Sequence, residues 1–438
     1  MLEPVIRGTV ILVLIIATVL PHGPTIRDRD LSLPYGFLRR DAGTWPAGLV
    51  LNALGGRADL SAAKIAQKEW MGLKIIKTIV SKEMLFLILG LLASGSSCRS
   101  AVTSPAPFGA YPYGSAAFHR FVQDSYEATG KGDPKGFHKW MDGVAARSGK
   151  AVTQTHSTSW TDKLETQRAQ RRRLTSVRSR VAAERRETAG LHLWVKKAIP
   201  RFSLDRGFEF PSVVGQGERQ CLLQSVLLAS MLQKSGIDAG AVMVFRNAED
   251  GESNIGHVVT IVKLSDGRDL LADASHKEPF VRQNGLLVWV TGAGYRFVKP
   301  VFLPGSTEIQ SYRLTATGRT VQLNQVRGLD IAFLRSQFAY YRGERAPGGI
   351  PSRHPTIAGL LTQSKWFRQS LARCPANPIS TYMLGRVCLQ TGRLRESGTL
   401  LDKAYNLYRT AGWVPPDVSQ IRQHAHSAAA ARSRRRGE

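Results

Sequence analysis

The feature that most constrains the fold is an apolar helix followed by three strand-like runs. The helix is predicted over Cys221–Lys234 (CLLQSVLLASMLQK), and Gly236 just beyond it is typical of a helix C-terminus. Runs rich in Val, Ile, Leu and Ala predict strands over 241–246, 257–264 and 268–275. A helix that is apolar all round must be buried. We therefore expect it to pack on an antiparallel sheet in an α+β fold.

The turn between the last two predicted strands determines which residues lie side by side. Residues 265–267 (Ser-Asp-Gly) predict a three-residue hairpin loop with Gly267 in the left-handed conformation. In that register Val259 faces Asp273, and His257 becomes a diagonal neighbour of Asp273 on the same face, about 7 Å away between backbones. A two-residue loop would shift the register by one and place the two side chains on opposite faces.

Cys221, His257 and Asp273 suit nucleophilic catalysis by cysteine. Cys221 begins a helix, where the macrodipole and the free N–H groups favour a thiolate. A cysteine nucleophile needs an imidazole, and the imidazole needs an acceptor that orients it. Each residue alone is more often structural, and His276 is a rival histidine. The sequence has no metal-ligand spacing, phosphate-binding glycine loop or dinucleotide fingerprint, so we expect neither metal nor cofactor.

The runs GERQCLLQSVLLASMLQKSGIDAGAVMVF and GHVVTIVKLSDGRDLLADAS resemble the transglutaminase-like superfamily, which has a papain-like fold. The resemblance covers about residues 190–300 and includes a short preceding helix that carries Trp194. It implies that Cys221 is the nucleophile, His257 the base and Asp273 the orienting carboxylate. The reaction implied is acyl transfer at an amide, through a thioester that water or an amine resolves.

The residues before the cysteine depart from that family. The sequence has Glu-Arg-Gln at 218–220, where a small, often glycine-containing run is expected. The oxyanion donor is therefore assigned to the side-chain amide of Gln216 or Gln220, beside the backbone N–H of Cys221.

A second resemblance concerns residues 353–410, which are predicted to be all-helical. Residues 377–407 resemble a tetratricopeptide repeat, with small and apolar residues at the positions where its two helices pack: Leu384, Gly385, Ser397, Leu401 and Ala404. One repeat cannot bury its face alone, so we expect a partner helix around 360–372. Cys374 and Cys388 are expected to be packing residues, although an oxidising compartment would permit a bond between them.

The N-terminal part has two hydrophobic segments, over 8–20 and 84–93. The second follows three lysines and leads into small residues, which is the order of a secretory signal peptide. Cys98 directly after it resembles the lipidated cysteine of a bacterial lipoprotein, although Gly95 stands where such signals usually carry Leu. We interpret Met71 or Met84 as the natural start. The alternative makes 5–20 a membrane anchor and 84–93 a buried helix.

The charge balance favours anionic partners. Lys and Arg number 60 against 33 Asp and Glu, a net charge of +27. Residues 161–189 predict one basic helix with a thin apolar stripe of Leu174, Val177 and Val181. A compositional bias of the source genome explains the arginines equally well. No aromatic residues interleave the arginine runs, and an export signal would separate the chain from nucleic acid, so nucleic-acid binding is not expected.

These observations predict an order of parts along the chain: an N-terminal extension (1–70), a signal or membrane segment (71–98), a linker and basic helix (99–190), a transglutaminase-like domain (191–310), a connecting segment (311–352), a tetratricopeptide-like region (353–412) and a basic tail (413–438). Within the tail, residues 428–438 are expected to be disordered. The function expected is that of a cysteine-dependent peptidase, amidase or acyltransferase. We expect it to be exported to the periplasmic side of a bacterial cell envelope and held at the membrane by its N-terminal segment.

The expected partners are a protein or peptide substrate and a partner protein at the helical repeat. The alternative is an inactive scaffold that binds a partner protein through its groove and repeat.

Overall fold

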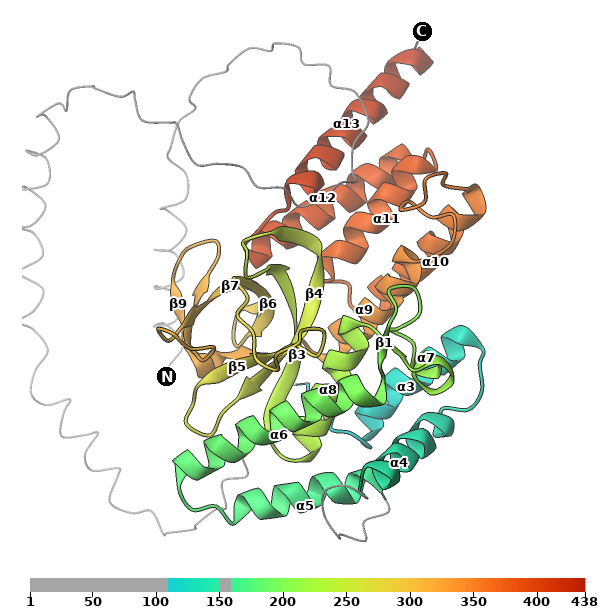
Figure 1. Ribbon diagram of the computed structural model, residues 1–438. Helices are drawn as coiled ribbons and strands as arrows, with labels where there is room; N and C mark the ends of the chain where they lie inside the picture. The colour runs from blue at the N-terminus through green and yellow to red at the C-terminus, as the bar shows by residue number, and fades with distance from the viewer. Residues whose placement is uncertain (1–108, 150–158, 438) are drawn as a thin grey trace, which may run out of the picture. The chain divides into compact units, whose positions relative to one another are not determined.

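The computed structural model describes residues 109–149 and 159–437, which belong to one compact unit. They form an α+β fold in which helices surround one antiparallel sheet (Figure 1). The hydrophobic segments at 8–20 and 84–93 and the lipidation candidate Cys98 lie outside the described residues. Within the described ranges, no helix is both long enough and apolar enough to cross a membrane.

The sheet closes on itself. Its strands are β3 (Asp238–Arg246), β4 (Glu252–Lys263), β5 (Asp269–Ala272), β6 (Gly285–Val290), β7 (Gly294–Phe302), β8 (Ile309–Leu314), β9 (Thr320–Val321) and β10 (Val326–Arg327). Their order is β10-β6-β3-β4-β5-β8-β7, with β9 beside β8, and an additional pairing of β6 with β7 completes a ring. The result is a small antiparallel barrel.

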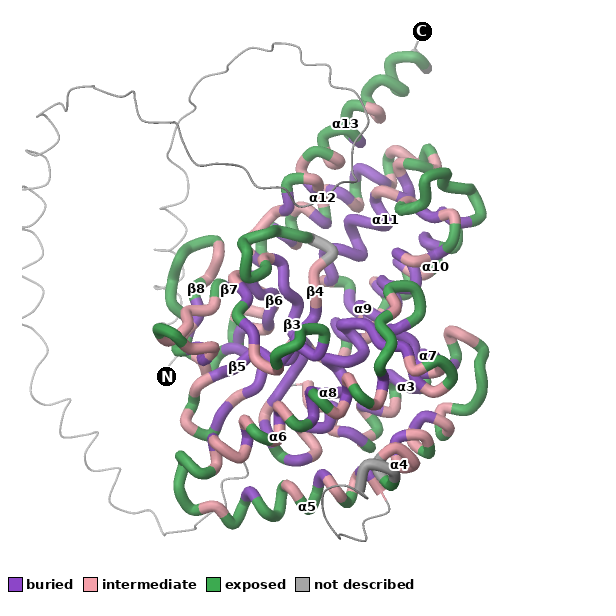
Figure 2. Tube along the Cα trace, in the orientation of Figure 1, coloured by how far each residue is buried: buried purple, intermediate pink, exposed green. Residues whose placement is uncertain are grey.

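Both faces of β3, β6 and the second half of β4 are buried, which explains their nearly continuous apolar sequences. Val259 and Ile261 of β4 belong to the apolar cluster inside the ring. Their neighbours Val258 and Val262 belong to the larger cluster that the surrounding helices cover. Figure 2 shows this burial along the strands and along the helix that carries Cys221.

The predicted hairpin register is confirmed. Ile261 pairs with Leu271 and Lys263 with Asp269, as the three-residue loop requires. Gly267 has a φ of 86°, in the left-handed region that favours glycine. The extension of this register beyond Ala272 brings the residue after it, Asp273, toward His257.

The predicted central helix is also confirmed, as α8 (Cys221–Lys234). Hydrogen bonds attach it to β4: the Ser225 hydroxyl donates to the Val258 carbonyl at 2.9 Å, and the Thr260 hydroxyl donates to the Ser225 carbonyl at 3.1 Å. Ser225 lies one helical turn after Cys221, and Val258 directly follows His257. The attachment therefore fixes the start of α8 near the histidine.

The N-terminal helices differ from the expected linker and single basic helix. They are α3 (Ala116–Thr129), α4 (Lys135–Gly149), α5 (Trp160–Arg172), α6 (Val177–Ala198) and α7 (Phe210–Gln216). Both α3 and α4 lie in the part of the chain that was expected to be a linker. Phe137 and Met141, one turn apart in α4, are fully buried and hold it to the core.

The basic run 161–189 forms two helices rather than one. Ser176 caps α6 by accepting a hydrogen bond from the Ser179 N–H at 3.0 Å, which separates α6 from α5. Leu174 lies in the break, and Val177 is exposed, whereas Val181 is buried. The apolar stripe predicted for one continuous helix is therefore wrong.

The C-terminal part is helical: α9 (Ile331–Glu344), α10 (Ile357–Arg373), α11 (Pro378–Gln390), α12 (Leu394–Ala411) and α13 (Pro416–Gly437), with a 3₁₀ turn at Leu323–Gln325. Residues 311–352, expected to connect two domains, contribute to the barrel and form α9, so they belong to the compact unit. The basic tail forms α13, which continues through residues 428–437, where disorder was expected. Its Val418 and Ala425 are buried, and its Arg422 pairs with Asp402 of α12 at 2.6 Å.

The predicted contact between α11 and α12 is present. A Cβ atom at Gly385 would lie 2.8 Å from Cγ of Leu401, which is closer than side chains approach. The Ser397 hydroxyl donates to the Gly385 carbonyl at 2.9 Å. Leu384 and Ala404 are buried beside this contact. Small residues at 385 and 397 therefore allow the two helices to pack closely.

Candidate active site

Cys221 lies at the first position of α8, at the end of a short two-stranded sheet. Strand β1 (Arg201–Phe202) pairs in parallel with β2 (Glu218–Arg219), which leads directly into Gln220 and Cys221. Gln220 is the N-cap, and its side-chain oxygen accepts from the Leu222 N–H at 3.2 Å. Cys221 is 6% exposed. The local sequence thus holds the thiol at a helix N-terminus with little freedom to move.

His257 and Asp273 meet as the sequence predicts. Nε2 of His257 lies 2.8 Å from Oδ2 of Asp273, whose other oxygen accepts from the Ser275 N–H at 2.8 Å. The Cys221 side chain is near enough to help raise the pKa of the imidazole. Since Nε2 faces the carboxylate, Nδ1 is the nitrogen available to the sulfur. The structure therefore brings together the three residues in the order cysteine, histidine, aspartate.

The electrostatics favour a charged histidine. Burial alone would lower the pKa of His257, but the hydrogen bonds and charges of Asp273 and Cys221 outweigh it and raise the pKa to about 10. Burial raises the pKa of Asp273, yet the hydrogen bond and charge of His257 leave that pKa below its ordinary value. The Asp273 side chain is 6% exposed and that of His257 32%. The imidazolium is thus held by a buried carboxylate and remains accessible to water.

Tyr341 completes the surroundings of the sulfur, and sequence reasoning missed it. Its hydroxyl lies 3.9 Å from Sγ of Cys221. Burial raises the pKa of Tyr341, so the phenol stays neutral and can donate to a thiolate. Tyr341 lies on α9, 120 residues after Cys221. No local sequence pattern connects the two positions.

His192 is a second missed residue and supports the Asp273 segment. Its Nε2 lies 3.0 Å from the carbonyl oxygen of Asp273 and 3.2 Å from that of His276, so it donates to both. Burial lowers the pKa of His192, which keeps it a neutral donor. The sequence placed residue 192 in a helix, but nothing in the helical pattern indicates its contact with the chain after β5.

The two candidate oxyanion donors lie in different environments. Gln216 is exposed at the last residue of α7. Gln220 is buried, but its side chain already interacts with Leu222 and Tyr341. Of the groups proposed from the sequence, the backbone N–H of Cys221 at the start of α8 is therefore the best placed for an oxyanion.

The remaining candidates take structural positions. His276 is exposed and its Nδ1 accepts from the Glu278 N–H at 3.1 Å. Cys374 and Cys388 are buried free thiols; Sγ of Cys374 lies 3.7 Å from the Tyr295 hydroxyl. Among the described residues, no group of three or more His, Cys, Asp or Glu side chains is arranged to hold a metal ion.

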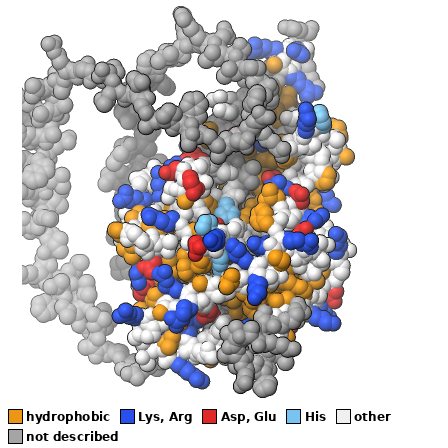
Figure 3. Space-filling view, viewed as in Figure 1, with side chains coloured by type: hydrophobic (Ala, Val, Ile, Leu, Met, Phe, Trp, Pro, Cys, Tyr) orange, Lys and Arg blue, Asp and Glu red, His pale blue; other side chains and the backbone are white. Residues whose placement is uncertain are grey.

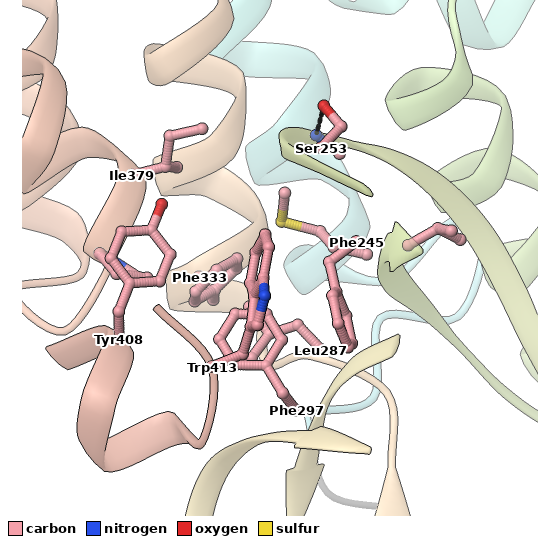
Figure 4. Close-up of a pocket in the computed structure, with 12 residues that line it drawn as sticks. Phe245, Ser253, Leu287, Phe297, Phe333, Ile379, Tyr408 and Trp413 are labelled. Carbon is pink, nitrogen blue, oxygen red and sulfur yellow. Dashed lines mark hydrogen bonds between the residues drawn. The ribbon is translucent and has the colours of Figure 1, made fainter. Parts of the chain in front are cut away.

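Figure 4 shows an apolar pocket between the barrel and the C-terminal helices. Gly256, which precedes His257, contributes to its wall, and so does Val244, which pairs with His257 across the sheet. Aromatic residues of the barrel and the C-terminal helices form much of the rest: Phe245, Phe297, Phe333, Tyr408 and Trp413. The Tyr408 hydroxyl is buried and has no hydrogen-bond partner among the described residues. The cavity measures about 20 Å³, which is room for a water molecule rather than for a side chain.

The surface charge is dispersed. Figure 3 shows Lys and Arg side chains scattered over one face among apolar and uncharged side chains, rather than gathered in one stripe. Comparison of the chain with protein-family models finds no match, and comparison with curated proteins finds none either. The chemistry of the site must be argued from its own geometry.

Proposed function

We propose that the protein is a cysteine-dependent amide hydrolase, a peptidase or amidase, with a transglutaminase-like core of papain-like fold. The observation that carries the proposal is the position of His257 between the Cys221 thiol and the Asp273 carboxylate. A helix N-terminus, an imidazolium and a neutral phenol around one sulfur all stabilise a thiolate. The transglutaminase-like resemblance of residues 190–300 agrees with this assignment.

In the proposed reaction the Cys221 thiolate attacks the carbonyl carbon of an amide. Negative charge forms on the carbonyl oxygen, where the Cys221 backbone N–H can stabilise it. His257 donates its proton to the leaving nitrogen, the C–N bond breaks, and a thioester with Cys221 remains. Neutral His257 then takes a proton from water, which attacks the thioester and releases the acid and the thiolate. Asp273 keeps the imidazole oriented in both steps.

One feature favours hydrolysis over transfer to an amine. The His257 side chain is partly exposed, so water reaches the base directly. We infer a polypeptide substrate from the resemblance of residues 190–300 to the transglutaminase-like superfamily.

The rest of the proposal concerns location and partners. The segment 84–98 supports export and attachment to a bacterial cell envelope, by a signal anchor or by a lipid on Cys98. The close contact between α11 and α12 supports a tetratricopeptide-like unit, with α10 as its neighbour and a partner protein as its ligand.

A second candidate function is an inactive scaffold that uses the same groove for binding. The observation that favours it is the low exposure of Cys221, which lies under the Tyr341 hydroxyl. A scaffold would keep the fold and bind a partner without forming a thioester.

The alkylation rate of Cys221 decides between the two. We expect iodoacetamide at pH 6.5 to modify Cys221 at least about tenfold faster than free cysteine, because only a few per cent of an ordinary thiol is ionised there. Mass spectrometry of peptides identifies the site, and the buried Cys388 serves as the internal control. A Cys221 that reacts no faster than free cysteine would favour the scaffold.

A further inference from the structure

The segment that precedes α7 carries two exposed apolar side chains beside the candidate active site. Phe202 of β1 is 52% exposed and Leu204 is 48% exposed. Large apolar side chains are usually buried, and a pair of them next to a catalytic cysteine indicates a contact surface. The neighbouring Lys197 and Arg201 are exposed as well.

The backbone of β1 has one side available for a further strand. The N–H of Arg201 donates to the Gly217 carbonyl at 3.0 Å, and the N–H of Ser203 donates to the Arg219 carbonyl at 3.0 Å. Backbone groups alternate in direction along a strand, so the N–H and C=O of Phe202 point away from β2. Both residues of β1 are exposed. The edge therefore offers a donor and an acceptor to an extended chain.

The edge is close enough to Cys221 for a peptide bound there to reach the thiol. Phe202 is aligned with Arg219, two residues before Cys221. Two residues span at most about 7 Å, and paired strands lie about 4.8 Å apart. A peptide strand added on the outer side of β1 would lie one further strand spacing from β1. About four residues of extended peptide span the distance from that added strand to Cys221.

We propose that β1 is a docking edge for the substrate, which binds there as an extended polypeptide strand. The segment pairs with the outward backbone groups of Phe202 and places apolar side chains on Phe202 and Leu204. Lys197 and Arg201 favour a segment that also carries an acidic residue. This inference rests on the proposed function, since it names how that site recognises its substrate class.

A polypeptide fits this surface better than a lipid bilayer does. Unpaired backbone groups need hydrogen-bond partners, which acyl chains do not provide. A second copy of the chain is also a poor occupant, because a two-residue edge is small against the roughly 1,200 Å² that a stable interface buries.

The test measures binding without turnover. The parent is the full chain with Cys221→Ser, and the probe is fluorescein-labelled lysozyme, reduced and carboxymethylated so that it is unfolded and carries added carboxylates. We expect Phe202→Ser with Leu204→Ser to weaken binding about tenfold in fluorescence anisotropy. Ile357→Ser with Leu361→Ser on α10 is the matched control, because those side chains are exposed to a similar degree. The control should bind like the parent.

Three results would overturn the proposal. In the first the parent does not bind the probe, and in the second both double variants bind it equally well. In the third the Phe202→Ser, Leu204→Ser variant still binds the probe but no longer floats with phosphatidylglycerol–phosphatidylcholine vesicles. The last result would assign the surface to lipid. A thermal melt checks the fold, and Phe202→Ala alone replaces the double variant if that melts early. If the wild-type chain binds the probe through this edge but does not cleave it, the docking edge stands and the proposed hydrolysis fails.

Discussion

The candidate active site and the contact between α11 and α12 are held together by different forces. Around Cys221 and His257 the contacts are few, polar and directional, and they fix protonation states as much as positions. Around Gly385 the contact depends on shape, since there is no room for a single methyl group. A change of atom type should therefore alter reactivity at the first region, and a change of volume should alter stability at the second.

The largest effect is expected from Cys221→Ser. The exchange keeps the shape but replaces a good nucleophile by a hydroxyl that is not ionised at neutral pH, so amide hydrolysis should fall at least about 10³-fold. The free energy of unfolding in urea should change by about 1 kcal/mol or less, because His257 and Tyr341 can hydrogen-bond to the hydroxyl.

Cys388→Ser is the control that reverses this pattern. Its thiol is fully buried in α11, so the variant should keep hydrolysis and lose about 1–3 kcal/mol of stability. Cleavage of the unfolded lysozyme probe and urea unfolding measure both quantities in both variants. Equal hydrolysis by the Cys221→Ser variant and wild type would remove this cysteine from the mechanism.

Asp273→Asn should lower the rate of hydrolysis about 10²-fold, which is less than the effect of Cys221→Ser. The nucleophile survives in this variant, while the imidazole loses its charged partner. The pKa of His257 should fall, since the carboxylate is one of the groups that raise it. Alkylation of Cys221 should then slow most below pH 7. Asp266→Asn in the hairpin loop is the matched control, because its carboxylate pairs with Arg268 outside the site. Similar losses in both variants would contradict the assigned role.

Gly385→Leu should destabilise the protein by about 1–3 kcal/mol through overpacking against Leu401. The alkylation rate of Cys221 should stay the same. Gly398→Ala in α12 is the control, since a Cβ atom there would lie 3.7 Å from His426, an ordinary contact, and alanine favours a helix. An unchanged melt in the Gly385→Leu variant would mean that the contact is looser than the structure indicates. Loss of Cys221 reactivity would make the helical region part of the catalytic unit.

The parts of the site that were predictable from sequence are those that local rules determine. The loop with Gly267 fixed the strand register, and the register fixed the meeting of His257 with Asp273. The helix that begins at Cys221 was predicted from the apolar run of residues 221–234 and from the glycine beyond its end. These features depend on spacings of a few residues, which a sequence displays directly.

The parts that were missed depend on contacts between distant segments. Tyr341 and His192 approach the site only through the packing of α9 and α6, which no periodicity encodes. The break before α6 was overlooked because Ser176, its cap, stands within an arginine-rich run that otherwise favours one helix. Residues 428–438 were expected to be disordered from their composition, yet α13, which Val418 and Ala425 anchor upstream, continues through residue 437. Composition does not show such sparse contacts.

The last prediction is a pH dependence that only the polar region should show. The pKa of His257 is raised from 6.5 to about 10, so its contribution to stability is complete below pH 6.5 and disappears as the pH rises through about 10. The pKa of Asp273 is lowered, so its contribution is present above pH 3.8 and disappears as the pH falls further.

The difference in unfolding free energy between wild type and a His257→Gln variant should therefore be larger at pH 6 than at pH 10.5. The difference between wild type and the Gly385→Leu variant should be the same at both values, because packing carries no proton. Urea unfolding of the three proteins at the two pH values measures this, and tyrosines and lysines that titrate near pH 10 cancel in the differences. If both differences shrink equally, the loss is general, and the imidazolium of His257 is not what distinguishes the active site from the helix contact.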